Sequence, residues 1–231
     1  MNELLSVDNL QAGYGDHPVV RDLCLQVHAG EVVALLGPNG AGKSTTLLTL
    51  AGDLSPIAGV VRMFGADSTD PLHRRARRGM ALVTEERSVL MGLTVAENLR
   101  LGRCDVARAI ALFPELERLM NRRCGLLSGG EQQIVPLARA IAREPRLLLA
   151  DELSLGLAPL VVRRLLETVR QAADEDGIGA LLVEQHVSQV LRIADRAYVM
   201  DRGRIVFSGD PADVARHIGT TGMSSSHGAQ Q

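Results

Sequence analysis

The feature that most constrains the fold is a glycine-rich stretch, LLGPNGAGKST at residues 35–45, between an apolar run and a helical pattern. Its spacing, G-x-x-x-x-G-K-[S/T], lets the backbone curl around phosphate oxygens and opens a helix whose positive end faces them. Lys43 is the single lysine in the chain, since every other permanently cationic side chain is an arginine. A compact ammonium fits between the β- and γ-phosphates of a nucleotide, whereas a planar guanidinium does not fit that cradle in the same way. The stretch therefore predicts a nucleoside triphosphate site.

The residues of this loop are the first candidates for nucleotide contacts. Ser44 places a hydroxyl where it can ligate Mg²⁺. The expected phosphate-binding residues are Gly37, Pro38, Asn39, Gly40, Ala41, Gly42, Lys43, Ser44 and Thr45.

Strand and helix patterns alternate along the chain, which predicts an α/β fold with a mostly parallel central sheet. Uninterrupted apolar runs such as VVALL, LLLA and ALLV are typical of central strands covered on both faces. The runs near both termini can form antiparallel strands. The strand-like runs are LLSVDNL, VVALL, VVRMF, MALV, LLLA, ALLV, AYVM and RIVFSG, and the helical patterns cover residues 44–51, 132–143, 159–173 and 187–194.

The middle and the end of the chain have other patterns. Residues from about 88 to 142 show helical stretches without a convincing strand, which predicts a helical subdomain inserted in the sheet domain. Residues 219–231 are small and polar without periodicity, so we expect one domain at 1–218 and a flexible polar tail.

The basic run HRRARR at 73–78 can touch nucleic acid or lipid head groups, but a solvated helix face is the simpler interpretation.

Composition excludes several classes of protein. The net charge of −2 has none of the basic excess that nucleic-acid binding usually needs, so no nucleic-acid partner is expected. Three scattered cysteines match neither a disulfide framework nor a metal-ligand spacing. No apolar run reaches the ~18 residues of a membrane span, so work at a membrane would need another chain to provide the span.

The segment LLLADE at residues 147–152 provides acidic partners for the phosphate loop. Its apolar residues predict a buried strand, and Asp151 emerges at the carboxyl end, where ligands of parallel sheets bind. We expect Asp151 to hold Mg²⁺ and Glu152 to polarise the attacking water, although a strand ending in two solvated acids remains the alternative.

The segment LSGGEQQ at residues 127–133 predicts a second anion site, because Ser128, Gly129 and Gly130 open a helix. One nucleotide does not need two such sites on one chain. The economical arrangement is a head-to-tail pair, in which the second site of each chain caps the γ-phosphate held by the other.

Together these motifs resemble those of ABC transporter ATPase subunits, from about residue 4 to 209. The resemblance implies a P-loop NTPase fold that hydrolyses ATP with Mg²⁺. It implies that Tyr14 stacks on adenine and that His186 contacts the γ-phosphate and water as a catalytic residue. The segment SLGL at 154–157 matches one that crosses the dimer interface.

Further segments resemble the branch that powers branched-chain amino acid importers, among them VTEER, LTVAENL, ALFPELERL, SLGLAP and LLVEQH. The resemblance then implies a second ATPase subunit, which can be identical or different, two transmembrane permease subunits and, indirectly, an external substrate-binding protein. It places the chain in the cytoplasm, peripheral on the inner face of the cell membrane. The transported substrate is not readable, because this chain does not touch it.

Three positions depart from the family pattern. Glu85 stands where most members have a Gln that ligates Mg²⁺, and a carboxylate can do the same; Glu is frequent in the branched-chain group. Leu153 replaces the usual Pro after Glu152, so we expect the following loop to be held differently. Pro136 lies inside the helix that starts at the second anion site, and we expect a kink there at a cost of ~3 kcal/mol.

Two alternatives to a transport ATPase stay open at this point. A non-transport ABC ATPase acting on DNA, ribosomes or cluster assembly is one, although its usual tandem domains, coiled-coil inserts and basic extensions are not visible. A degenerate subunit that binds ATP while a sister chain hydrolyses it is the other, prompted by Pro136 and Leu153.

Overall fold

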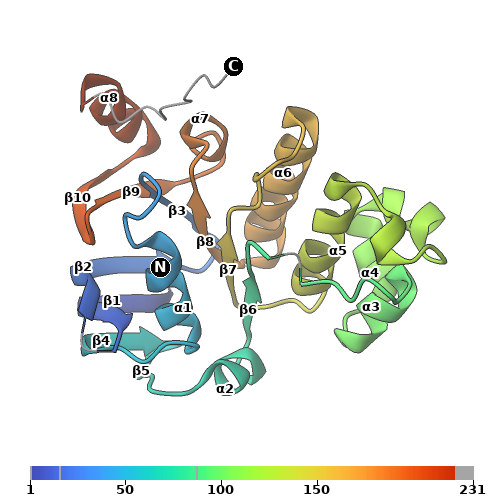
Figure 1. Cartoon of the computed structure of the whole chain (residues 1–231), viewed down its shortest axis with the longest axis horizontal. Coiled ribbons are helices and arrows are strands. Elements are labelled where there is room, and N and C mark those ends of the chain that lie inside the picture. Colours follow the sequence, from blue (N-terminus) through green and yellow to red (C-terminus); the bar gives the residue numbers. More distant parts are fainter. Residues whose placement is uncertain (1, 16, 87, 222–231) are drawn as a thin grey trace.

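The computed structural model describes residues 2–15, 17–86 and 88–221, and two sheets with covering helices make up the fold (Figure 1). The predicted tail at 219–231 lies largely outside these residues; positions 219–221 complete the last helix, α8 (Pro211–Thr221). None of the helices in the described ranges is long and apolar enough to cross a membrane.

The larger sheet has six strands in the order β10-β9-β3-β8-β7-β6. All neighbouring pairs are parallel except β10 with β9, so the predicted parallel centre and the antiparallel C-terminal strand are confirmed. Its strands are β3 (Val32–Leu36), β6 (Met80–Val83), β7 (Leu147–Asp151), β8 (Gly179–Glu184), β9 (Arg196–Asp201) and β10 (Arg204–Gly209).

The smaller sheet is antiparallel, with four strands in the order β2-β1-β4-β5. Its strands are β1 (Glu3–Tyr14), β2 (His17–His28), β4 (Ala58–Met63) and β5 (Ala66–Asp67). The sequence patterns missed β2 and β5. Strand β2 is largely exposed on one face, and polar residues interrupt its apolar positions.

Helices fill the connections between the strands. Those outside the middle segment are α1 (Lys43–Ala51), α2 (Leu72–Arg77), α6 (Pro159–Asp176) and α7 (Val187–Val190). Between β6 and β7 the chain forms α3 (Val95–Leu101), α4 (Val106–Leu112), two 3₁₀ helices at Pro114–Leu119 and Cys124–Leu126, and α5 (Gly129–Ile141). These elements gather at one end of the molecule (Figure 1). The only strand-like pairing in this described segment outside named strands is one bridge, Thr94 to Arg123.

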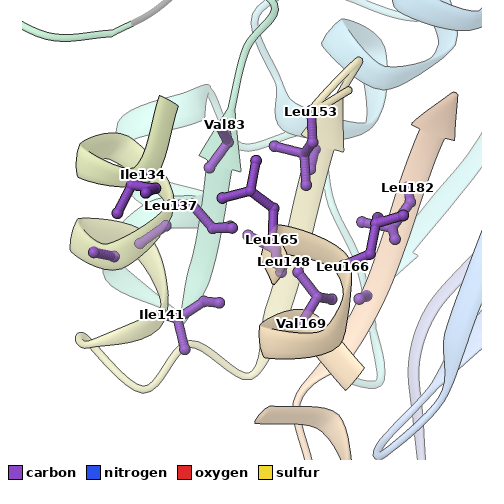
Figure 2. Close-up of a cluster of buried hydrophobic side chains, with 14 of the residues drawn as sticks. Val83, Ile134, Leu137, Ile141, Leu148, Leu153, Leu165, Leu166, Val169 and Leu182 are labelled. Carbon is purple, nitrogen blue, oxygen red and sulfur yellow. The ribbon is translucent and has the colours of Figure 1, made fainter. Parts of the chain in front are cut away.

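Alternate side chains of β3 face two separate cores, which explains its uninterrupted apolar sequence. Val33 and Leu35 pack with Leu47 of α1 and with the smaller sheet. Val32, Ala34 and Leu36 belong to the other core, to which α5 and α6 contribute. Figure 2 shows part of this second core, where side chains of α5 and α6 meet those of β6, β7 and β8. The helices α1 and α5 therefore lie on opposite faces of the larger sheet.

The basic run at 73–78 is more than a solvated helix face. Arg75 of α2 is 1% exposed. Its guanidinium donates to the carbonyls of Thr49 (3.2 Å) and Leu50 (2.6 Å) in the last turn of α1, and to those of Asp70 and Ser68. A cation is favourable at a helix C-terminus, where carbonyls lack helical partners. Arg75 thus anchors the phosphate-loop helix from its far end, and the simple solvated-face interpretation is wrong for this residue.

Pro136 lies within α5 without ending it, since one continuous helix runs from Gly129 to Ile141. The start of the helix is reinforced by a capping box in which the Ser128 hydroxyl accepts from Glu131 N, and Glu131 accepts from Ser128 N at 2.9 Å. Such a cap contributes about 1 kcal/mol.

Candidate active site

The phosphate loop connects β3 to α1 and depends on glycines at two positions with left-handed backbone. Gly40 has φ 78° and Gly42 has φ 103°, conformations that favour glycine. A Cβ at Gly42 would lie 2.9 Å from Met200 Cε, so the position is also crowded. The backbone of Gly203 donates to the Ala41 carbonyl at 2.9 Å, which ties the loop to the turn between β9 and β10.

Lys43 begins α1 and is almost fully buried, with 5% of its surface exposed. Its Nζ donates to the carbonyls of Gly37 (2.8 Å) and Pro38 (3.1 Å), so the ammonium lies inside the curl of the loop. Burial lowers the pKa of Lys43, while nearby Glu152 and other carboxylates favour its charged form. The ammonium group of Lys43 therefore lies where the sequence predicts the phosphates.

Asp151 ends β7, and its carboxyl accepts a hydrogen bond from the Ser44 hydroxyl. Burial raises the pKa of Asp151, and the nearby carboxylates of Glu152 and Glu85 raise it further. Among the described residues Asp151 Oδ1 is buried without a hydrogen-bond partner. A buried oxygen of this kind beside a hydroxyl fits Mg²⁺, which prefers hard oxygen ligands, and a divalent cation would favour the ionised carboxylate.

Glu152 follows β7 with φ 48°, unusual for a residue with a side chain. Its amide donates to Val183 O at 2.9 Å, which continues the β7–β8 pairing. The side-chain amide of Gln185 donates to Glu152 Oε1, so the structure places Gln185 rather than His186 against this carboxylate. His186 is exposed and precedes α7, and its contact with the γ-phosphate stays a prediction.

Sequence reasoning missed Glu184, although a carboxylate that ends an apolar strand is a visible signal. The side chain is 1% exposed, and burial raises its pKa to about 7. The Ser154 hydroxyl donates to Glu184 Oε2 at 2.5 Å, and the Ser154 amide donates to Oε1 at 3.2 Å.

Tyr14 ends β1 and is 58% exposed, so much of its surface is open to a ligand. It pairs with His17 across the turn into β2. Farther along β2, the side chains of Val19 and Val20 lie next to Gly42. The strand that follows Tyr14 therefore passes beside the phosphate loop, although no described contact joins Tyr14 to that loop.

The second predicted anion site lies at the start of α5. Ser128 is exposed, Gly129 and Gly130 are half-buried, and the helix begins at Gly129. A Cβ at Gly130 would lie 3.2 Å from the Val161 side chain of α6, so any larger residue would need Val161 to shift by a few tenths of an ångström. The two predicted anion sites therefore lie at the starts of two different helices, α1 and α5, which pack in different cores.

The motifs of this site lie within or near a segment that matches a known family. A family model described as ABC transporter matches residues 20–154. The chain belongs to the ABC transporter family. It is the ATP-binding subunit of such a transporter and an ATPase, which confirms the prediction made from its motifs.

Known relatives agree on the family and differ in what they transport. The chain is 40% identical to the high-affinity branched-chain amino acid transport ATP-binding protein BraG of Pseudomonas aeruginosa, over 88% of this chain and 91% of that protein. It is 35% identical to the lipopolysaccharide export system ATP-binding protein LptB of Acidithiobacillus ferridurans, over 93% of each chain. A solved structure of an ATP-binding subunit of an ABC transporter matches with a TM-score of 0.80 and 32% identity, over 94% of this chain and 93% of that one. The likeness to BraG confirms the predicted resemblance to the branched-chain branch.

Proposed function

We propose that two such chains, or this chain and a close relative, close head to tail around ATP and Mg²⁺. The presence of two separate helix N-termini suited to anions supports the proposal, because one nucleotide does not need both sites on one chain. The loop around Lys43 would hold the phosphates, and the Ser128 turn of the second chain would cap the γ-phosphate. Tyr14, exposed at the end of β1, would stack on adenine.

The residues around the γ-phosphate would divide the chemistry between them. Lys43 would exchange its bonds to the loop carbonyls for bonds to phosphate. Ser44, Asp151 and Glu85 would hold Mg²⁺, which supplies positive charge to the phosphate oxygens. Glu152 would accept a proton from the attacking water, and the Gln185 amide would orient the Glu152 carboxylate through the bond the two residues make.

Coupling to membrane partners would use a groove of about 650 Å³ between the helical segment and the sheet. Ser88, Pro136 and Arg139 contribute to its lining, together with residues of α2 and β6. Arg139 of α5 donates to Ser88 O at 2.6 Å, which joins the helix of the second anion site to the segment that follows Glu85. A partner bound in this groove would therefore contact both α5 and the segment that follows Glu85.

We infer that the partners are two permease subunits and, indirectly, an external binding protein, with this chain peripheral on the cytoplasmic face of the membrane. Import of branched-chain amino acids or related amino acids and amides is supported by the relative BraG. The likeness to LptB favours a second candidate, a transporter with a different cargo.

Turnover of the purified chain tests the ATPase assignment at this site. Wild-type protein with Mg²⁺ should hydrolyse ATP, and Glu152→Gln should bind ATP and dimerise without turnover. The control is Glu167→Gln, which removes an exposed carboxylate of α6 and should keep the wild-type rate. Native turnover by Glu152→Gln would overturn the role of Glu152.

The partner proposal needs a membrane experiment. The chain should copurify with a polytopic membrane protein, and in proteoliposomes leucine, isoleucine or valine with a binding protein should stimulate ATP hydrolysis. Stimulation by lipopolysaccharide would favour the second candidate, and stimulation by nucleic acid would favour a non-transport ATPase. Turnover only in the presence of a sister ATPase would favour a degenerate subunit.

A further inference from the structure

Hydrogen bonds join the chain after β7 to the end of β8, beyond Asp151 and Val183, the last pair of these two strands. Glu152 N donates to Val183 O, and the Gln185 side chain donates to Glu152 in the opposite direction. Two residues on, both the amide and the hydroxyl of Ser154 donate to the carboxyl group of Glu184. Each strand therefore continues into a segment held by the other.

The bond between Glu184 and Ser154 is almost completely shielded from water, with Glu184 1% and Ser154 3% exposed. Burial of a carboxyl group is costly unless donors compensate it. Ser154 donates one hydrogen bond to each carboxyl oxygen. The apolar neighbour Leu153, also 1% exposed, packs in the core beside β7 (Figure 2).

Ser154 lies in the turn that follows Glu152 and opens the segment at 154–157, of which Leu155 and Gly156 are exposed. Leu155 N donates to Glu152 O at 3.2 Å, and Leu157 N donates to Ser154 O at 3.3 Å. Glu152 itself has left-handed backbone, which persists only where the surroundings hold it. From inside the protein, the carboxyl group of Glu184 accepts two hydrogen bonds from this turn.

We propose that Glu184 is a positioning residue that, through Ser154, fixes both the backbone of Glu152 and the segment at 154–157. The inference rests on the proposed function, in which Glu152 activates water and this segment meets the second chain. It adds a residue outside the set proposed above to hold nucleotide and metal. A displacement of about 1 Å in a catalytic group can lower a rate about a hundredfold, so the loss of one such bond is measurable.

Steady-state kinetics of Ser154→Ala and Glu184→Ala test the proposal. Both variants should lower kcat at least about tenfold and change the KM for ATP by less than about twofold. The kcat of the double variant should be little lower than that of either single variant, because the two residues act as a pair. Glu184→Gln, which keeps the volume and an acceptor, should recover activity to within about threefold of wild type.

The matched control is Thr168→Val, which removes another buried hydroxyl, one that donates to Arg164 O within α6. It should lose stability without a change in kcat. Wild-type kcat in Ser154→Ala, or strictly additive losses in the double variant, would overturn the proposal.

Amide hydrogen exchange gives a second readout that needs no turnover. Exchange at residues 153–157 should accelerate about tenfold or more in Glu184→Ala and remain near wild type in Glu184→Gln. Unchanged exchange in Glu184→Ala would overturn the proposal even if the wild-type chain hydrolysed no ATP. Lack of wild-type turnover, or turnover by Glu152→Gln, would instead count against the proposed function.

Discussion

Replacing Glu184 by Gln should remove a specific pH dependence from the stability of the fold. Burial raises the pKa of Glu184 from an ordinary 4.5 to about 7. The folded state therefore binds this proton more tightly than the unfolded state does. Its contribution to the free energy of unfolding is full below pH 4.5, decreases as the pH rises towards about 7, and is lost above it.

The size of the effect follows from the same shift. Each pKa unit corresponds to about 1.4 kcal/mol, so ionising Glu184 in the folded protein costs about 3 kcal/mol. The amide introduced by Glu184→Gln carries no charge at any pH. The difference in the free energy of unfolding between Glu184→Gln and wild type should therefore grow in favour of the variant by about 2–3 kcal/mol from pH 5 to pH 8.

Urea denaturation followed by circular dichroism at several pH values measures this difference. Other titrating groups are present in both proteins, so they largely cancel. Glu167→Gln, at an exposed position of α6, is the control, and it should show no comparable change. A difference between Glu184→Gln and wild type that stays within about 0.5 kcal/mol across this range would refute the reasoning.

Three further predictions use the same structure. Lys43→Arg should lower kcat at least about a hundredfold in an ATPase assay, because a planar guanidinium group cannot replace the ammonium within the loop; a native rate would contradict this. Arg75→Met should lower the free energy of unfolding by about 3 kcal/mol, because it leaves buried carbonyls without a donor; a loss below about 1 kcal/mol in urea denaturation would count against it. Gln185→Ala should lower kcat about tenfold, since the Gln185 side chain bonds to Glu152; a native rate would contradict this.

The spacing of residues along the sequence was enough to predict the positions of the phosphate loop and of Asp151. The loop before Lys43 needs left-handed glycines, and such positions are visible as glycines in the sequence. Asp151 was predictable because an uninterrupted apolar run identifies a buried parallel strand, and its carboxyl end is the ligand-binding edge. The sheet as a whole followed from the alternation of strands and helices.

Contacts between segments distant in the sequence were not predictable. The bond between Glu184 and Ser154 joins residues 30 positions apart, and no local pattern encodes it. Arg75 was misread because a basic run usually faces water, while the carbonyls at the end of α1 that it satisfies are visible only in three dimensions. The bond from the Gln185 side chain to Glu152 joins residues 33 positions apart, so it too was not readable from the sequence.

The most direct test of the account is the mass of the Glu152→Gln protein in light scattering with ATP and Mg²⁺. We expect a dimer of twice the 24.8 kDa chain that retains one ATP per chain, and a monomer without nucleotide. Replacing Ser128 by a bulky residue should abolish the dimer while ATP still binds to the loop around Lys43. A Glu152→Gln protein that binds ATP and stays monomeric would contradict the claim that the nucleotide is closed between the loop of one chain and the Ser128 turn of another.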